Sequence, residues 1–482
     1  MVVCGDINAK SETRRVPCPY DPSHSVYLHR LKAHMEKLCN ARPPATRPAH
    51  TVPDCNVALL PPGYAEGSFS ECGQLWAEEG LAKADTRLMV QPGEHAYLGT
   101  TNSKLFGDLR TSAQDNLLSA TAAPLTEATT HRLLRPVVSS YLRSLSAAPD
   151  NIEEMGLVEL LDLVRPTEDL PLDICTHSAL DERRLLKTNA KHVLQQASLL
   201  GHLDKRGLLD AKYAFIEFGA GKGELSVYLH AALGSALAEQ DSCICLVDRK
   251  NFRQKFSVAG DGDDQVALVE SSRGHFTRIH IDIRDLDLAK VAELQTEDKT
   301  TGAVQLRPIV AYSKHLCGAA TDLTIRCLER YQQAGGTVAG IAIALCCHQA
   351  CKYSMYVDHE YLSTAMMSDS GAGRWGSSQR SEFRHLMAMS SWAINAPAPP
   401  QQQDPQQQQQ RDGLEADPAA HCSGLTFDQR VRAGHAVKRF IDIGRAAYVR
   451  RALSMNDVEL VYYTTRSTSP ENLALLGTKA AL

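Results

Sequence analysis

The stretch FIEFGAGKGE, residues 215–224, has the residue types and the spacing of a ligand-binding site. An apolar run typical of a strand carries Glu217 near its end, a G-x-G-x-G turn follows, and residues 225–233 continue with helical spacing of apolar side chains. Glycines in such a turn accept positive φ and bring the backbone close to a ligand, while the helix start offers N–H donors. We expect this turn to bind a nucleotide-like ligand through Glu217, Gly219, Gly221 and Gly223.

The charged residues around the turn indicate which ligand it suits. An acidic side chain before the glycines can balance a cation such as S-adenosylmethionine, whereas a phosphate-binding loop ends in Lys followed by Ser or Thr. Here Lys222 is followed by Gly223 and Glu224, so the phosphate-binding ending is missing. The pattern favours a methyl-donor pocket. A dinucleotide-binding fold and a purely structural turn are the alternatives.

Two further acidic residues end predicted strands. Asp248 follows the strand at 243–247 and is placed to accept hydrogen bonds from a ribose diol, although it lies farther from Gly219 than the usual spacing of roughly 20 residues. The alternative for Asp248 is an ordinary strand-end acid in a loop. Asp282, in the run IHIDIRD, could reach an adenine amine, with Asp285 as the competing choice.

Polar residues also follow the predicted strand at 308–312, in the sequence SKHLCG of residues 313–318. In an open α/β sheet, ligand-binding and catalytic groups gather at the carboxyl ends of the strands. Lys314 and His315 stand there beside a glycine, so we interpret them as candidate catalytic residues. A plain strand-to-helix loop is the alternative.

A second strand end carries the sequence ALCCHQAC, residues 344–351. Its thiols and His348 resemble metal ligands, but adjacent residues on a strand point to opposite faces, which makes a single site from Cys346 and Cys347 awkward. An active-site loop that includes His348 is the favoured interpretation. A second zinc site and buried structural thiols are the alternatives.

Four possible zinc ligands lie close together near the N-terminus, at Cys18, His24, His34 and Cys39. Two thiols and two imidazoles suit tetrahedral zinc, and metal binding would supply the folding free energy of a segment with little core. Incidental Cys and His residues in a loose helix are the alternative. The basic residues around them would either contact RNA or form a merely solvated surface. They are Arg14, Arg15, Arg30, Lys32 and Lys37.

The composition is that of an ordinary globular protein, with 482 residues of which 43% are hydrophobic and 22% charged. A net charge of -5 argues against a basic surface over the whole molecule and leaves room for local basic patches. Neither a signal peptide nor a membrane-spanning run is visible. The 14 cysteines are therefore expected to be reduced thiols, metal ligands or active-site residues and not disulfides, in an intracellular protein of the nucleus or the cytoplasm.

Strand and helix patterns alternate from about residue 206 onward, which predicts a mostly parallel sheet with crossover helices. The predicted strands are 213–218, 243–247, 277–283, 308–312, 338–345 and 458–463. Residues 396–420 are rich in Gln and Pro, cannot bury a core, and are expected to be disordered. We divide the chain into a zinc finger at 15–42, a linker at 43–74, a mainly helical region at 75–205 and an α/β domain at 206–482.

Together these motifs resemble one family, the Trm13-type tRNA 2′-O-methyltransferases. The resemblance rests on the CHHC pattern at 18–39, EFGAGKG at 217–223, SKHLCGAATDL at 313–323, CCH at 346–348 and SPEN at 469–472. It implies a doubly wound, class I (Rossmann-like) methyltransferase sheet, preceded by a small CHHC zinc finger and a helical region. It also implies S-adenosyl-L-methionine and Zn²⁺ as cofactors and position 4 of a tRNA acceptor stem as the target. No membrane association and no protein partner are predicted.

Methylation of a ribose 2′-hydroxyl, which the resemblance implies, needs a group that accepts or polarises the proton. Lys314 and His315 are the candidates, with His348 in support; positioning alone is the alternative. The chain departs from the family pattern at Gln349 and at the His34–Cys39 spacing, which is one residue longer. Of a preceding CCCH finger only Cys4-Gly5-Asp6 is present, so that either the finger is lost or the start of the chain is truncated. A Rossmann-type nucleotide-dependent enzyme and a non-catalytic RNA-binding adaptor are the alternative functions.

Overall fold

The computed structural model divides the chain into two compact units, which we describe separately. Residues 15–39 and Lys250 belong to the first unit, and the other described residues belong to the second. His24 and the predicted disordered segment at 396–420 lie outside the described residues. The structure describes residues 15–19, 25–39, 48–57, 125–145, 148–166, 168–181, 190–239, 242–250, 276–297, 302–366, 379–394 and 421–479.

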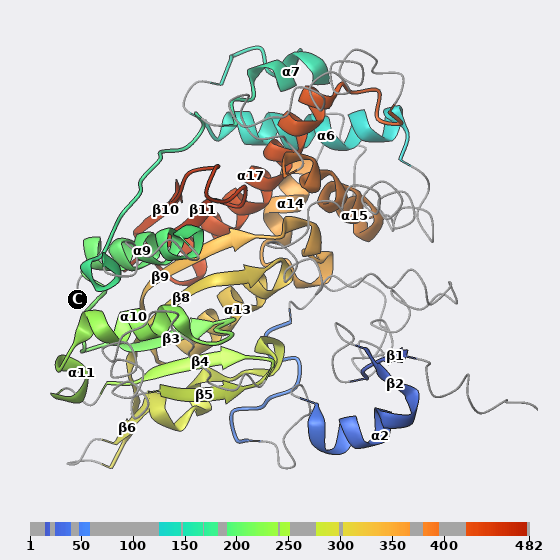
Figure 1. Ribbon diagram of the computed structural model, residues 1–482. Helices are drawn as coiled ribbons and strands as arrows, with labels where there is room; N and C mark the ends of the chain where they lie inside the picture. Colours follow the sequence, from blue (N-terminus) through green and yellow to red (C-terminus); the bar gives the residue numbers. More distant parts are fainter. Residues whose placement is uncertain are drawn as a thin grey trace, which may run out of the picture. The chain divides into compact units, whose positions relative to one another are not determined.

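The first unit is a short hairpin followed by one helix (Figure 1). Strand β1 (Arg15–Pro17) pairs antiparallel with β2 (Ser25–Tyr27), and the helix is continuous through η1 (Leu28–Arg30), α2 (Leu31–Ala33) and a π-helical turn, η2 (His34–Leu38). None of the helix residues is buried. Among the described residues of this unit, the buried apolar side chains are those of Cys18 and Cys39. The described residues of this unit therefore form almost no apolar core of their own.

The second unit is built on a mixed sheet of seven strands (Figure 1). The strands are β3 (Ala214–Phe218), β4 (Ile244–Asp248), β5 (Phe276–His280), β8 (Pro308–Cys317), β9 (Thr337–Cys346), β10 (Asp457–Tyr462) and β11 (Leu473–Thr478). Their order across the sheet is β10-β11-β9-β8-β3-β4-β5. The five strands from β9 to β5 are parallel, and β11 runs antiparallel to both of its neighbours.

Helices cover both faces of this sheet. Alternate residues of β3 point to opposite faces, so that Phe215 packs in one apolar core and Ile216 in the other. Helices α9 (Ala190–Lys205) and α10 (Glu224–Leu233) bury Leu199 and Leu229 in the core that contains Phe215. Helices α13 (Ala319–Gln333) and α17 (Phe427–Ala452) bury Leu328 and Val449 in the core on the other face. The result is a three-layer α/β unit.

Helix α17 also packs against α6 (Glu127–Arg143), α7 (Leu157–Leu163) and α15 (Gln379–Ser390). Helix α6 starts at Thr126, whose side chain accepts a hydrogen bond from the backbone N–H of Thr129. A further helix, α14, spans His359–Met366. None of the helices in the described part of the chain is both long and apolar enough to cross a membrane.

Short elements complete the second unit. Residues 48–57, within the predicted linker, pack against the segment after β5: the Asn56 side chain donates hydrogen bonds to the carbonyls of Ile283 and Leu286, at 2.6 and 2.7 Å. A small hairpin pairs β6 (Gln295–Glu297) with β7 (Val304–Leu306). The short helices are η3 (Ser178–Leu180), α11 (Ala236–Glu239), η5 (Ile283–Asp285), η6 (Leu288–Lys290), η7 (Ala292–Leu294), η8 (His348–Ala350), η9 (Tyr353–Met355) and η10 (Ser391–Ala393).

The six predicted strands are all present in the sheet, with ends that shift by a few residues. The largest shift is in β8, which continues to Cys317, so Lys314 and His315 lie on a strand and not in the loop that the sequence predicted. An irregularity in the pairing with β9 between Ser313 and Leu316 makes this part of β8 bulge. The sequence prediction missed β11, and the predicted domain bounds stay a prediction.

Candidate functional site

The glycine-rich turn leaves the end of β3 in a conformation that favours glycine. Gly219, Gly221 and Gly223 have φ angles of 64°, 53° and 80°. A Cβ atom on Gly219 would lie 2.6 Å from the carbonyl oxygen of His315, whereas a Cβ on Gly221 would meet no heavy atom within 4 Å. The backbone is thus packed tightly on one side of the turn, toward β8, and is open at its tip.

Two side chains hold the tip of this turn. The backbone N–H of Gly221 donates a hydrogen bond of 2.8 Å to Asp248 Oδ2 at the end of β4. Arg278 on β5 donates to the carbonyl oxygens of Gly221 and Lys222, at 2.7 and 3.2 Å. Burial lowers the pKa of Arg278, and the charges of Asp248 and Glu217 oppose that shift. The sequence prediction missed Arg278, although a charged residue inside a predicted strand is a signal that could have identified it.

Glu217 lies beneath the turn, with 4% of its surface exposed. Its carboxylate accepts a hydrogen bond from the hydroxyl of Ser226 on α10, and the Ser226 hydroxyl lies 2.5 Å from that of Tyr312 on β8. Burial raises the pKa of Glu217 to about 7, although the Ser226 hydrogen bond favours the ionised form. Glu217 is therefore a carboxyl group that a nearby positive charge would readily ionise.

Asp282 follows β5 and caps the short helix η5. Its Oδ1 accepts a hydrogen bond of 3.0 Å from the backbone N–H of Arg284, and about a third of its side chain is exposed. The competing residue, Asp285, accepts from the backbone N–H of Asp54 at 2.8 Å. Both carboxylates thus stabilise the local backbone, and the assignment of Asp282 to an adenine stays a prediction.

Lys314 lies on β8 directly against the glycine turn. The preceding residue, Ser313, donates a hydrogen bond of 2.7 Å to the carbonyl of Phe218, which joins β8 to the start of the turn. The Lys314 side chain is 9% exposed, and its Nζ lies 3.0 Å from His192 Nδ1 on α9. Burial lowers the pKa of Lys314 to about 8, although the charges of Glu224 and Glu217 oppose the shift.

The imidazoles beside Lys314 complete this cluster. The ring of His315 meets the ring of His192 edge-on, with centroids 6.1 Å apart. Burial lowers the pKa of His192, and the charge of Lys314 lowers it further. His315 remains partly exposed, and its carbonyl faces Gly219. The sequence prediction missed His192, because the helical region that carries it has no chemical motif.

His348 lies elsewhere, in a buried charge network between η8 and α17. It is fully buried, and its Nε2 lies 2.8 and 2.9 Å from the two carboxylate oxygens of Asp442. Arg445 contacts Asp442 at 3.4 Å and binds Asp322 through two hydrogen bonds of 3.1 and 2.6 Å. No hydrogen bond to His348 Nδ1 is present among the described residues. A catalytic role for His348 stays a prediction, and in this structure it orients the turn after β9.

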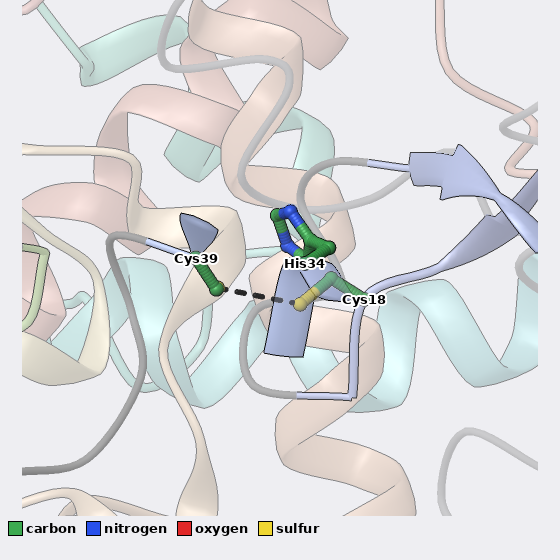
Figure 2. Close-up of side chains that lie close together, drawn as sticks. All are labelled: Cys18, His34 and Cys39. Carbon is green, nitrogen blue, oxygen red and sulfur yellow. Dashed lines mark hydrogen bonds between the residues drawn. The ribbon is translucent and has the colours of Figure 1, made fainter. Parts of the chain in front are cut away.

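Three of the four predicted zinc ligands meet in the first unit (Figure 2). One ligand atom from each of Cys18, His34 and Cys39 lies within 4.8 Å of the others, and the two sulfurs are 3.5 Å apart. The fourth ligand of the prediction, His24, lies outside the described residues. Two thiols and an imidazole at this spacing fit the tetrahedral coordination of zinc, with Zn–S distances of about 2.3 Å.

The longer spacing between His34 and Cys39 has a structural explanation. The backbone N–H of Cys39 donates a 2.7 Å hydrogen bond to the carbonyl of His34, five residues earlier, so the helix ends in a π turn. A π turn accommodates one more residue than an α turn. It therefore returns Cys39 to the side of Cys18 despite the extra residue.

A family model described as Methyltransferase TRM13 matches residues 194–478, more than half of the chain and all seven strands of the sheet. The chain belongs to the TRM13 family. A model described as a U11-48K-like CHHC zinc finger matches residues 15–37, which include Cys18, His24 and His34 and stop before Cys39. The resemblance found in the sequence is confirmed.

Relatives in the TRM13 family align over long stretches of this chain. The tRNA:m(4)X modification enzyme TRM13 of Schizosaccharomyces pombe is 28% identical over 481 residues, which cover 98% of both proteins. The enzyme of the same name from Eremothecium gossypii is 34% identical over 314 residues, or 61% of this chain and 64% of that protein. The TRM13 homolog of Mus musculus is 26% identical and covers 99% of this chain and 89% of that protein. Membership in the TRM13 family makes this chain a tRNA-modifying methyltransferase with a CHHC finger.

Proposed function

We propose that this protein transfers a methyl group from S-adenosylmethionine to a ribose 2′-hydroxyl at position 4 of a tRNA acceptor stem. The observation that supports this best is the contact between the glycine turn and the end of β8. Because the carbonyl of His315 faces Gly219 and Ser313 is bonded to Phe218, a donor at the turn and the Lys314 side chain would share one site.

The sheet topology supports a class I methyltransferase fold. The β5-β4-β3-β8-β9 part has the order of a Rossmann-type sheet, in which ligands bind where the strand order reverses, here between β3 and β8. The antiparallel strand β11 between β9 and β10 distinguishes the class I methyltransferase sheet from a dinucleotide-binding sheet. This feature disfavours the alternative of a Rossmann-type oxidoreductase.

The residues around the turn fit S-adenosylmethionine, which would supply an electrophilic methyl group on a sulfonium. Gly221 leaves open space at the tip of the turn, and Gly223, the N-cap of α10, provides no side-chain cap for the first N–H groups of the helix. We assign the ribose of the donor to Asp248, the adenine to Asp282, and the balance of the positive charge to the buried Glu217. Gly219 and Gly223 shape the backbone.

Lys314 is the proton acceptor in this proposal. With a pKa of about 8, a fraction of about one tenth is neutral at pH 7 and can accept the proton of a hydroxyl. His192 holds the ammonium form by a hydrogen bond, and His315, partly exposed beside it, would contact the ribose. His348 supports the site by orienting the turn after β9. In the first unit, Cys18, His24, His34 and Cys39 would hold one structural Zn²⁺.

Methyl transfer to tRNA in vitro tests the proposal. The full chain is incubated with isotope-labelled S-adenosylmethionine and unmodified tRNA, and the digested tRNA is analysed for 2′-O-methylnucleosides and their position. We expect label in a 2′-O-methylnucleoside at position 4. Lys314→Ala should abolish transfer, and the matched control Lys290→Ala, whose side chain is exposed and pairs with Asp287, should not change it.

Two outcomes would favour the alternatives. Label on a base, or at another ribose, would contradict the assigned target. Binding of tRNA without binding of the donor would favour the non-catalytic RNA-binding adaptor, and binding of NAD or ATP in place of the donor would favour a nucleotide-dependent enzyme. Calorimetry of the donor with the wild type and with Gly221→Asp, which places an anion at the tip of the turn, distinguishes these outcomes.

A further inference from the structure

Three thiols meet at the ends of two neighbouring strands of the sheet. Cys317 ends β8 and Cys346 ends β9, and the two residues are partners in the parallel pairing of these strands. Their sulfurs are 3.5 Å apart, and the sulfurs of Cys317, Cys346 and Cys347 all lie within 4.8 Å of one another. The cluster is separate from the CHHC finger, which belongs to the other unit.

The conformation of Cys347 brings the adjacent thiols together. On a regular strand Cys346 and Cys347 would point to opposite faces, which was the reason to doubt a shared site. Cys347 instead adopts a φ of 52°, a left-handed conformation that is uncommon for a residue with a side chain. Its backbone N–H donates to Glu471 Oε1 at 3.2 Å, and the backbone N–H of Gly318 donates to the carbonyl of Cys346. Strained backbone of this kind often marks a functional site.

The spacing of the sulfurs suits a shared metal ion. With Zn–S distances of about 2.3 Å and tetrahedral angles, ligand sulfurs lie about 3.8 Å apart. A disulfide would bring two sulfurs to about 2.05 Å and leave the third thiol without a role. A cluster of three thiols therefore fits a soft metal better than it fits a single disulfide.

We propose that Cys317, Cys346 and Cys347 form a second zinc site with three thiolate ligands and one coordination position for a ligand that is not a cysteine. Binding replaces three S–H bonds by three Zn–S bonds and releases the three protons to solvent. The ion would fasten the end of β8 to the turn after β9, three residues beyond Lys314. The site does not depend on the proposed methyl transfer.

Another group of possible ligands does not share these properties. Asp173, Cys175 and His202 also lie close together. However, Lys205 pairs with Asp173 at 2.8 Å, and His202 Nε2 lies 2.9 Å from the Asp173 carbonyl oxygen. The protein itself satisfies the charges and hydrogen bonds of that group, so a metal is not needed there.

Zinc content of the full chain tests the inference. The protein is equilibrated with Zn²⁺ and a reductant, freed of loosely bound metal, and analysed by mass spectrometry for zinc per chain. We expect two zinc ions in the wild type and in the control Cys422→Ser, whose thiol is exposed. One ion should remain in Cys18→Ser, one in Cys317→Ser and none in the double variant. A single ion in the wild type that is lost in Cys18→Ser would overturn the proposal.

Cobalt spectroscopy and alkylation give readings that do not require the Cys317 variant to fold. In Cys18→Ser loaded with Co²⁺, the sulfur-to-cobalt absorption should be that of three thiolates, whereas the finger has two. In the wild type, Cys317, Cys346 and Cys347 should resist iodoacetamide until a strong chelator removes the metal. Alkylation of these thiols that is the same with and without the chelator, or a Cys317–Cys346 disulfide under reducing conditions, would contradict the site.

Discussion

Replacement of Lys314 by Met should make the protein less active and more stable at the same time. Lys314 is buried next to His192, and its pKa is lowered from 10.5 to about 8 because the folded protein disfavours the ammonium form. The shift corresponds to a penalty of about 3 kcal/mol on the folded state wherever the lysine is protonated in both states. The lost hydrogen bond to His192 offsets about 1 kcal/mol. We therefore expect Lys314→Met to be about 2 kcal/mol more stable at pH 7.

The pH dependence of this gain has a defined direction. Below pH 8 both folded and unfolded wild type carry a protonated Lys314, and the penalty is fully present. Between pH 8 and 10.5 the folded state loses the proton first, so the stability of the wild type rises with pH and the difference from the variant shrinks. Above pH 10.5 the charge penalty is gone. Urea unfolding at pH 7 and at pH 10 measures both values.

Activity should change in the opposite direction. A proton acceptor at this position contributes a factor of roughly 10² to 10⁴, so single-turnover rates with saturating donor and tRNA should fall by at least about 10² in Lys314→Met. The wild-type rate should rise with pH and level off near pH 8. A rate within about threefold of the wild type, less than 1 kcal/mol of barrier, would refute the assignment of the base. A variant that is less stable at pH 7 would refute the burial penalty. The exposed Lys290→Met is the matched control.

The remaining predictions concern the glycine turn and the buried ion pairs. A cationic donor favours the ionised form of Glu217, whose pKa is raised to about 7, so donor affinity should rise from about pH 6 to pH 8 and binding should release a proton. Glu217→Gln should abolish this pH dependence. Calorimetry in buffers of different ionisation enthalpy measures both effects. Gly221→Ala should lower the free energy of unfolding by about 1–2 kcal/mol, because its φ is positive. Gly219→Ala should lower it clearly more, because the added methyl group would also clash with the carbonyl of His315. Equal losses of the two variants in thermal unfolding would argue against the contact between Gly219 and His315. Asp322→Ala leaves the buried Arg445 without its main partner and should lower the free energy of unfolding by about 3–5 kcal/mol. A loss below about 1 kcal/mol would show that the Asp322–Arg445 ion pair is not buried in solution.

The sequence predicted the parts of the site that depend on local pattern. The apolar run before Glu217 and the spacing of Gly219, Gly221 and Gly223 define a strand, turn and helix within ten residues, and the structure has all three there. The order of possible zinc ligands likewise predicted the approach of Cys18 to His34 and Cys39. Both predictions required only neighbouring residues and known coordination chemistry.

Contacts between distant segments could not be predicted in this way. Arg278 reaches the glycine turn from β5, and His192 reaches Lys314 from a helix more than a hundred residues earlier in the chain. His348, in the turn after β9, meets Asp442 on α17, which lies 94 residues later in the chain. Cys347 follows the last residue of β9 and has a left-handed conformation, so the alternation of a strand does not apply to it, and its sulfur lies within 4.8 Å of that of Cys346.

The position of β11 between β9 and the edge strand β10 affects how the protein can fold during synthesis. Strand β9 is made long before residues 473–478, yet β11 is the strand that covers its outer edge. Until those residues leave the ribosome, the apolar sequence TVAGIAIALC presents unpaired backbone groups along that edge. Nascent chains can therefore aggregate through the exposed edge of β9. Shortened chains that stop before Leu473 would keep this edge exposed permanently. Chaperone demand should accordingly depend on how quickly translation passes from β9 to β11.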